Sequence, residues 1–294
     1  MTESISHTQL QQWLPQVCLI ALQAGRGISQ MYREHCAHQG LAVERKGDGT
    51  PVTQADRDAD ELIYRALQAM TPEIPLVTEE SVAQFAFAER QDWHTYWLVD
   101  PLDGTKEFIE ATGEYSVNIA LIINHQPVLG VVFGPEVGKL YFALRGEAAY
   151  GLTIAVQQLD LEHLSMPSLL AQAQPIHSAK MQPNQLTKVA VSRHHGGRTQ
   201  HFMSQLGACE TIKMGSALKA CLVAEGAAHV YPRFGPTSLW DTAASQVIVE
   251  MAGGAMLNAA KHPLEYVQTP SLLNPSFMVV CQSDYAWPPI PEVL

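Results

Sequence analysis

The stretch Trp97-Leu98-Val99-Asp100-Pro101-Leu102-Asp103-Gly104-Thr105-Lys106-Glu107-Phe108 joins a short apolar run to two aspartates and a turn. The apolar run from Tyr96 to Val99 predicts a buried strand, and Asp100 follows it directly. Ligands of open α/β sheets bind beyond the carboxyl ends of the strands, which is where this run places Asp100. Pro101 fixes φ and has no N–H, so the chain can turn sharply and bring Asp103 alongside Asp100.

The end of this stretch has the features of an anion-binding turn. Gly104 has no side chain, so an anion can approach its backbone closely. A short helix that begins at Thr105 would point the free N–H groups of its first turn at that anion. Two carboxylates beside such a cradle repel phosphate unless a hard cation lies between them, and Mg²⁺ suits oxygen ligands of this kind. The stretch therefore predicts metal-assisted phosphate chemistry, although D-x-x-D-G alone is more often a surface turn.

Length and composition limit the class of protein. The 294 residues are enough for two modest domains or one large layered domain. Hydrophobic residues make up 47% and charged residues 16%, which is typical of a soluble globular protein. The net charge of −11 argues against a nucleic-acid polymer as partner. The five cysteines are scattered and form no C-x-x-C pair, which suits a reducing cytosol and indicates neither disulfides nor a zinc site.

The sequence carries no visible targeting or membrane-spanning segment. Its polar start lacks the basic and apolar regions of a signal peptide. No apolar run approaches the roughly 20 residues that cross a bilayer. We expect a cytoplasmic protein without a transmembrane segment, and a monomer and a homodimer are both open.

Helical patterns dominate the first 70 residues. Apolar residues at steps of three and four predict a helix within residues 8–37. A second helix is expected from Thr53 to Met70, where Thr53 and Asp56 form a capping box that explains Asp56 structurally. A short strand over Ile74–Val77 then leads to Glu79, whose carboxylate could merely favour the start of the next helix.

An antiparallel meander follows the central stretch. Ser116–Ile123 and Pro127–Phe133 predict a hairpin around Asn124-His125, and Leu140–Leu144 predicts a further strand. We expect three regions: an N-terminal domain over 1–155, a linker or surface insertion over 156–187, and a C-terminal domain over 188–294.

The C-terminal region contains scattered basic residues beside predicted elements. A strand is expected over Val189–Ser192, and an apolar helix follows Gly215–Lys219. Lys219 alone is as well explained by a side chain whose stem lies on apolar surface and whose head reaches solvent. Another strand ends at Tyr231-Pro232-Arg233. Leu239–Ala244 opens the last long helix, where Asp241 could be only a cap or a dipole partner.

Two signatures far apart in the chain resemble those of one family. D-P-L-D-G-T-K-E-F at 100–108 and W-D-T-A-A at 240–244 are similar to the two signatures of the inositol monophosphatase superfamily. The Lys-Glu-Phe ending resembles the CysQ-type branch, the 3'(2'),5'-bisphosphate nucleotidases, and Pro51-Val52-Thr53-x-x-Asp56 resembles a third family motif. The resemblance implies an α/β fold (layered α+β) in which helices and sheets alternate as an α/β/α/β/α sandwich. It also implies that the active site lies between two domains.

The resemblance also implies roles for residues of this chain. Two or three Mg²⁺ ions would be held by the carboxylates of Glu79, Asp100, Asp103 and Asp241 and by the carbonyl of Leu102. Asp56 would accept a hydrogen bond from the hydroxyl of Thr105. Thr105 would then orient the attacking water, and Glu79 would assist in orienting it. Groups expected to contact substrate are those of Gly104, Thr105, Lys106, Ser192, His195, Ser216, Lys219, Arg233 and Asp241, of which Arg233 offers a planar fork that suits phosphate.

The substrate implied by the resemblance is a small phosphorylated nucleotide. We expect cleavage of 3'-phosphoadenosine 5'-phosphate to AMP and phosphate, with inhibition by Li⁺ or Ca²⁺. The alternatives are an inositol or sugar monophosphatase with the same metal site, and a catalytically silent regulator that binds Mg²⁺ or nucleotide. The resemblance to the family also leaves open that the cytoplasmic protein attaches peripherally to the inner membrane. No stretch of the sequence is basic or amphipathic enough to indicate such attachment.

Overall fold

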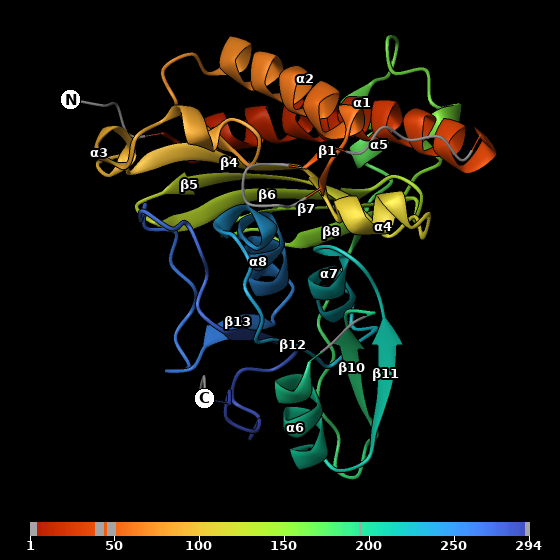
Figure 1. Ribbon diagram of the computed structural model, residues 1–294, viewed down its shortest axis with the longest axis vertical. Helices are drawn as coiled ribbons and strands as arrows, with labels where there is room; N and C mark the ends of the chain where they lie inside the picture. The colour runs from red at the N-terminus through yellow and green to blue at the C-terminus, as the bar shows by residue number, and fades with distance from the viewer. Residues whose placement is uncertain (1–4, 39–43, 46–50, 194–195, 292–294) are drawn as a thin grey trace.

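The computed structural model describes residues 5–38, 44–45, 51–193 and 196–291. Helices and two sheets alternate in stacked layers (Figure 1). The two large sheets have seven and five strands, and both mix parallel and antiparallel pairs, whereas a third sheet has only two strands. The predicted layered α/β class is therefore confirmed.

The outer helical layer consists of α1 (His7–His38) and α2 (Gln54–Met70), as predicted. Helix α1 continues through Pro15, because buried residues on both sides, among them Leu10 and Val17, outweigh one missing hydrogen bond. The predicted capping box opens α2, where the Thr53 N–H donates to Asp56 Oδ2 over 2.8 Å. The short strands β1 (Glu44–Arg45) and β2 (Pro51–Val52) precede α2.

The seven-stranded sheet lies under these helices and follows chain order from β3 to β9. Only β3 and β4 run parallel, and each later neighbour is antiparallel. The hairpin predicted around Asn124-His125 is present, and both residues have positive φ, as a tight hairpin turn requires. The strands are β3 (Leu76–Thr78), β4 (Thr95–Asp103), β5 (Ser116–Ile123), β6 (Gln126–Gly134), β7 (Lys139–Leu144), β8 (Ala149–Thr153) and β9 (Gln174–Pro175).

The prediction that the central strand ends at Val99, directly before Asp100, is wrong. Strand β4 pairs with β5 as far as Asp103, and its register shifts between Asp100 and Asp103. Pro101 cannot donate to the ladder, and a bulge lets the strand pass such a residue without ending. The short helix α4 (Thr105–Ile109) then begins at the residue predicted for it.

Part of residues 156–187 pairs with the seven-stranded sheet, which we call the first sheet. These residues contain η2 (Val156–Gln158), α5 (Met166–Leu170) and β9, which pairs with β8. Leu161 and Leu169 are buried in the same core as α1. The division at 155 and 187 stays a prediction. Two further short helices, η1 (Val82–Gln84) and α3 (Phe87–Arg90), connect β3 to β4.

The five-stranded sheet has the order β11-β10-β12-β14-β13. Its strands are β10 (Thr187–Val191), β11 (Cys209–Lys213), β12 (Val230–Arg233), β13 (Ala255–Asn258) and β14 (Phe277–Val280). Helix α6 (Gly197–Gln205) packs on it through Phe202, whose ring meets that of Phe234. Helix α7 (Leu218–Ala224) ends one residue before the predicted position, Glu225.

The last helix is shorter than predicted and begins later. Asp241 lies in a separate turn, η3 (Leu239–Asp241), and α8 (Ala243–Met251) follows it. The backbone of Thr242, with φ −123° and ψ −30°, interrupts the two. Asp241 is thereby placed at a bend rather than within a long helix.

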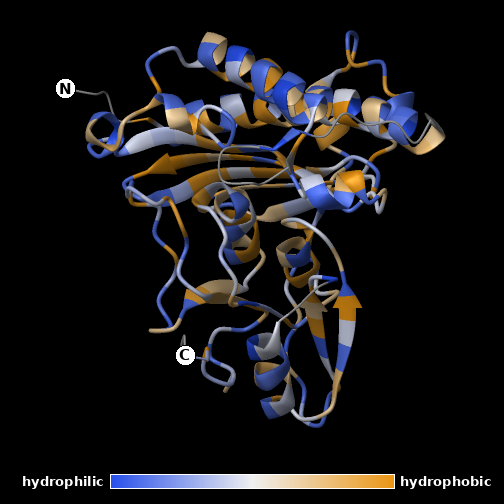
Figure 2. Cartoon of the chain, viewed as in Figure 1, coloured by the Kyte–Doolittle hydropathy of each residue, from blue (hydrophilic) through white to orange (hydrophobic). Residues whose placement is uncertain are grey.

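Helix α8 packs directly on the backbone of the first sheet. A Cβ on Gly130 of β6 would lie 2.4 Å from the Ala244 carbonyl oxygen, so only glycine allows this approach. Figure 2 shows apolar residues concentrated in the strands beside this layer. In the part of the chain that the structure describes, no helix is both long and apolar enough to cross a membrane.

Candidate active site

Three carboxylates from two parts of the chain meet at the end of the first sheet. One oxygen each of Asp100, Asp103 and Asp241 lies within 4.8 Å of the others. Strand β4 supplies the first two, and η3 supplies Asp241. Glu79 is next to them, because Thr78 is paired with Val99 and the Glu79 N–H donates to the Val99 carbonyl over 3.1 Å. The adjacent parallel strands thus bring Glu79 and Asp100 to one sheet edge.

The electrostatics of this cluster favour a bound cation. Burial and then the neighbouring Glu79 raise the pKa of Asp100 well above its ordinary value. Burial raises the pKa of Asp103 to about 6, and burial together with Asp103 raises that of Asp241 to about 8. Negative charge at these positions is therefore costly without a counter-charge. An all-oxygen donor set of this kind fits Mg²⁺.

Each carboxylate is oriented by a backbone N–H. Leu102 N donates to Asp100 Oδ1 over 3.1 Å, and Ser238 N donates to Asp241 Oδ2 over 3.0 Å. Ala217 N donates to Asp103 Oδ2 over 2.5 Å. Each of these bonds uses one oxygen of its carboxylate.

Two polar side chains of β5 support Asp103 and were missed in the sequence. Asn118 Nδ2 donates to Asp103 Oδ2 over 3.2 Å, and Ser116 Oγ donates to Asn118 Oδ1 over 2.9 Å. Both are buried in an otherwise apolar strand. Because they are two residues apart, they share one face, and this pairing was the signal that could have identified them. The Ala217 N–H had no such signal, since it depends on a distant loop.

The turn after β4 is tied to the start of α2. Thr105 Oγ1 donates to Asp56 Oδ1 over 3.0 Å. The other Asp56 oxygen accepts from the Thr53 hydroxyl over 2.6 Å as well as from its N–H. Gly104 has φ +98°, a value that L side chains rarely adopt. The capping role and the contact with Thr105 are therefore compatible.

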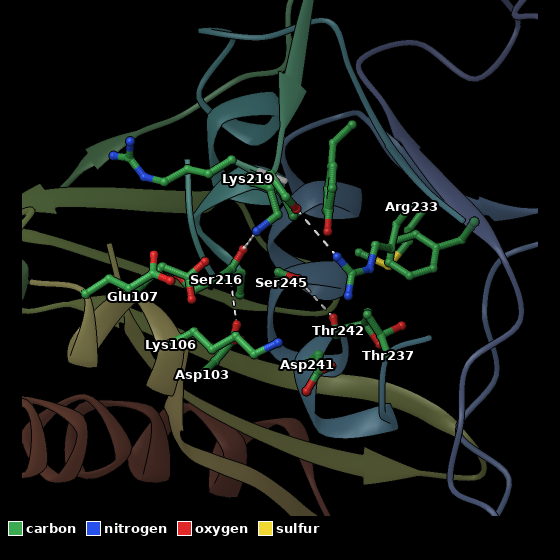
Figure 3. A pocket seen from close by; sticks show the side chains of 18 residues that line it. Asp103, Lys106, Glu107, Ser216, Lys219, Arg233, Thr237, Asp241, Thr242 and Ser245 are labelled. Carbon is green, nitrogen blue, oxygen red and sulfur yellow. Dashed lines mark hydrogen bonds between the residues drawn. The ribbon is translucent and has the colours of Figure 1, made fainter. Parts of the chain in front are cut away.

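A cavity of about 330 Å³ opens beside the carboxylates (Figure 3). The predicted residues in its wall are Asp103, Lys106, Ser192, Ser216, Lys219, Arg233 and Asp241. Further residues in the wall, which were not predicted, include Glu107, Glu110, Arg193, Thr237, Thr242 and Ser245. Asp56, Glu79, Asp100, Leu102, Gly104 and Thr105 lie outside this wall on the β3, β4 and α2 side, and His195 lies outside the described residues.

Two basic side chains form part of the cavity wall. Lys219 is buried, so the solvent-exposed alternative is wrong; its Nζ donates to the Ser216 carbonyl over 2.6 Å and lies 5.4 Å from the centre of the Tyr231 ring. Burial lowers its pKa to about 8, although Asp103 acts in the opposite direction. Arg233 donates from Nη2 to the Pro236 carbonyl over 2.9 Å, and from Nη1 to Ser192 Oγ over 3.5 Å.

Known proteins resemble this chain over most of its length. A model of the inositol monophosphatase family matches residues 13–285. The 3'(2'),5'-bisphosphate nucleotidase CysQ of Escherichia coli K12 is 40% identical over 270 residues, which is 90% of this chain and 98% of that one. The CysQ of Salmonella typhimurium is 42% identical over the same shares.

Solved structures of two proteins are similar to the structure of this chain. The crystal structure of CysQ from Bacteroides thetaiotaomicron has a TM-score of 0.74 at 38% identity and covers 89% of this chain and 94% of that one. An inositol monophosphatase from Anabaena has a TM-score of 0.67 at 21% identity, covers 93% of this chain and 92% of that one, and shows likeness of fold.

Proposed function

This chain belongs to the inositol monophosphatase family, and we propose that it is a Mg²⁺-dependent 3'(2'),5'-bisphosphate nucleotidase. The preferred reaction is removal of the 3'-phosphate of 3'-phosphoadenosine 5'-phosphate, which yields AMP and phosphate. The observation that carries the proposal is the carboxylate cluster, which borders a cavity whose wall also holds Lys219 and Arg233. The carboxylates suit a cation that binds the reacting phosphate, and the two basic residues suit a second anionic group of the substrate.

Metal dependence is general to the family, and we propose two or three Mg²⁺ ions for this chain. The side chains that would hold them are Glu79, Asp100, Asp103 and Asp241, together with the Leu102 carbonyl. Bound ions would stabilise the attacking and leaving oxygens of an in-line displacement and lower the pKa of water.

Thr105 and Asp56 would orient the attacking water. The Thr105 hydroxyl gives its hydrogen to Asp56, so its oxygen can accept a hydrogen bond from water. Thr53 holds the other Asp56 oxygen, which fixes the direction of that acceptor. Glu79 would assist, and the N–H groups of Gly104 and Thr105 would stabilise charge on the transferred phosphoryl group.

The remaining predicted residues would bind the rest of the substrate. Ser216, Lys219 and Arg233 would together bind the ribose and the second phosphate. Lys106, Ser192 and His195 would complete the binding site. A cytoplasmic location and a monomeric or homodimeric state stay predictions.

Phosphate release in the presence of Mg²⁺ tests the proposal directly. Equal concentrations of 3'-phosphoadenosine 5'-phosphate and inositol 1-phosphate are compared, and we expect the nucleotide to be cleaved much faster. A preference for inositol 1-phosphate would keep the metal mechanism and overturn the substrate. Release from neither, together with tight nucleotide binding, would favour the silent regulator. Asp103→Asn should retain its circular dichroism spectrum and lose turnover.

A further inference from the structure

The turn η3, which supplies Asp241 to the carboxylate cluster, lies beside the irregular segment 266–276. The backbone of this segment pairs with that of Ser238 and its neighbours through an isolated antiparallel bridge and two hydrogen bonds of 2.9 Å. A single 3₁₀ turn has few hydrogen bonds of its own, and their geometry is poorer than in an α-helix. We therefore expect contacts from outside the turn to fix the direction of Asp241.

One side chain of this segment, Asn274, spans both ends of the turn. Its Nδ2 donates to the Ser238 carbonyl over 2.6 Å and to Thr242 Oγ1 over 3.1 Å, and a longer contact of 3.4 Å joins it to Thr237 Oγ1. Because a carbonyl oxygen can only accept, the amide nitrogen and not the amide oxygen must face Ser238. Ser238 N donates in turn to Asp241 Oδ2 over 3.0 Å. The residue that Asn274 holds by its carbonyl therefore orients Asp241 by its N–H.

Thr242 connects Asn274 to the bend that follows Asp241. The Thr242 hydroxyl donates to the Leu239 carbonyl over 3.2 Å, which leaves its oxygen to accept from Asn274. Thr242 is buried, and its backbone forms the bend between η3 and α8. Thr237 and Thr242 also form part of the cavity wall beside Asp241 (Figure 3). Loss of the Asn274 contacts would therefore act on both ends of the turn that carries Asp241.

A buried arginine of the first half of the molecule holds the segment that carries Asn274. Arg90, at the end of α3, is 4% exposed, and its Nη1 donates to Gln268 Oε1 over 2.8 Å and to the Thr269 carbonyl over 2.7 Å. Its Nη2 donates to the Pro270 carbonyl over 3.5 Å. Hydrogen bonds from a charged donor are stronger than those between neutral groups. Because α3 connects β3 to β4, this arginine ties the segment to the strands that carry the other carboxylates.

We propose that Asn274 is a positioning residue for Asp241, the proposed metal ligand, and that Arg90 anchors the segment from which Asn274 acts. The inference rests on the proposed function, because it takes Asp241 as a ligand of Mg²⁺. Neither Asn274 nor Arg90 forms part of the cavity wall. Both therefore act through the backbone of η3 and not by contact with substrate.

Calorimetric titration of the full chain with Mg²⁺, after removal of bound metal with EDTA and without substrate, tests the inference. Asn274→Leu keeps roughly the volume of the side chain and removes its donors. We expect this variant to bind Mg²⁺ about tenfold more weakly than the wild type, as is typical when a residue that orients a metal ligand is lost. Arg90→Lys keeps the charge but loses the planar fork, and it should weaken binding by a smaller factor. The double variant should equal Asn274→Leu, because Arg90 acts through Asn274.

Asn258 offers a matched control in the same half of the molecule. It ends β13, its Oδ1 accepts from the Ala260 N–H over 2.9 Å and from the His262 N–H over 3.1 Å, and it lies outside the cavity wall. Asn258→Leu should lower the unfolding temperature without changing the affinity for Mg²⁺. Wild-type affinity in Asn274→Leu, or an equal loss of affinity in Asn258→Leu, would overturn the inference. Effects of Arg90→Lys and Asn274→Leu that multiply would overturn the role of Arg90.

The wild-type protein separates this inference from the proposed function. Binding of Mg²⁺ without cleavage of nucleotide would contradict the proposed function and leave the calorimetric comparison valid. Failure of the wild type to bind Mg²⁺ would overturn both. If Asn274→Leu does not fold, Asn274→Ser, which keeps a single donor, takes its place. Its affinity for Mg²⁺ should also fall, and an unchanged affinity would again count against the inference.

Discussion

At the scale of single residues, His229 is a buried imidazole that the fold keeps neutral. It lies directly before β12, and its Nδ1 accepts from the Lys188 N–H over 2.9 Å. A neutral imidazole that accepts at Nδ1 carries its hydrogen on Nε2. The Gln185 amide nitrogen lies 2.9 Å from Nε2, so the amide accepts this hydrogen only with its oxygen and nitrogen exchanged. Burial, with a smaller effect of Lys188, lowers the pKa of His229. Protonation would therefore break a contact of the second sheet.

This histidine predicts a pH dependence of stability. Its pKa is lower in the folded state, so below pH about 6.5 the unfolded chain binds a proton that the folded protein does not. The contribution of His229 is thus fully present above that pH and is lost as the pH falls. Urea unfolding at pH 7.5 and 5.5 should show that the stability difference between wild type and His229→Gln is smaller at the lower pH. His163→Gln, at an exposed position, serves as control, and a constant difference for His229→Gln would contradict the prediction.

At the scale of elements, the packing of α1 on the first sheet depends on one glycine. A Cβ on Gly25 would lie 2.5 Å from two ring carbons of Phe133 in β6 and 2.9 Å from Pro135 Cγ. A Cβ on Gly27, two residues later in the same helix, meets no atom within 4 Å. The two positions share the helix and differ in the space beside them.

Alanine at these positions should change stability in opposite directions. Gly25→Ala forces the helix away from the sheet, so we expect a loss of about 1–3 kcal/mol, as for other overpacked sites. Gly27→Ala adds only helix propensity, so we expect a gain of about 0.5–1 kcal/mol. Urea midpoints of both variants measure this, and an equal gain in both would show that α1 does not rest on Phe133 as described.

Elements that depend on local sequence could be predicted, and elements that depend on a partner strand could not. The helix within 8–37 and the hairpin at Asn124-His125 depend on local periodicity and turn residues, and both are present. Strand β4 runs past Pro101, because a partner strand accepts the bulge and nothing local announces that partner. Strand β9 has only two residues and is defined by its pairing with β8.

The site residues also divide into those that a local stretch of sequence identifies and those that only the fold brings together. Asp100 and Asp103 could be identified because they belong to one contiguous stretch, and Asp241 because its own short string resembles a signature. The Ala217 N–H that orients Asp103, and the pair of Glu114 and Arg193, could not be identified, since each contact joins residues that are 79 or more positions apart. Such contacts have no periodicity and no motif in the sequence, and only the packed fold brings them together.

At the scale of the whole molecule, the carboxylate cluster joins the two halves at an electrostatic cost. The first sheet supplies Asp100 and Asp103, and the C-terminal half supplies Asp241. Their pKa values are raised because the charged forms are buried together. A carboxylate whose pKa is higher in the folded state destabilises the fold above its unfolded pKa, and this penalty diminishes as the pH falls. Without a cation, the junction between the halves is therefore strained near neutral pH.

Mg²⁺ should reverse the stability order of wild type and Asp103→Asn. In EDTA at pH 7.5, the variant should be the more stable protein, because one buried like charge is removed. At a Mg²⁺ concentration of about 100 times its Kd, the wild type should gain about 2.7 kcal/mol, and the variant should gain much less. Thermal unfolding with EDTA and with Mg²⁺ measures both, and Asp160→Asn, at an exposed position, controls for general effects of charge. An equal Mg²⁺-dependent shift in wild type and Asp103→Asn would place the stabilising cation away from this cluster.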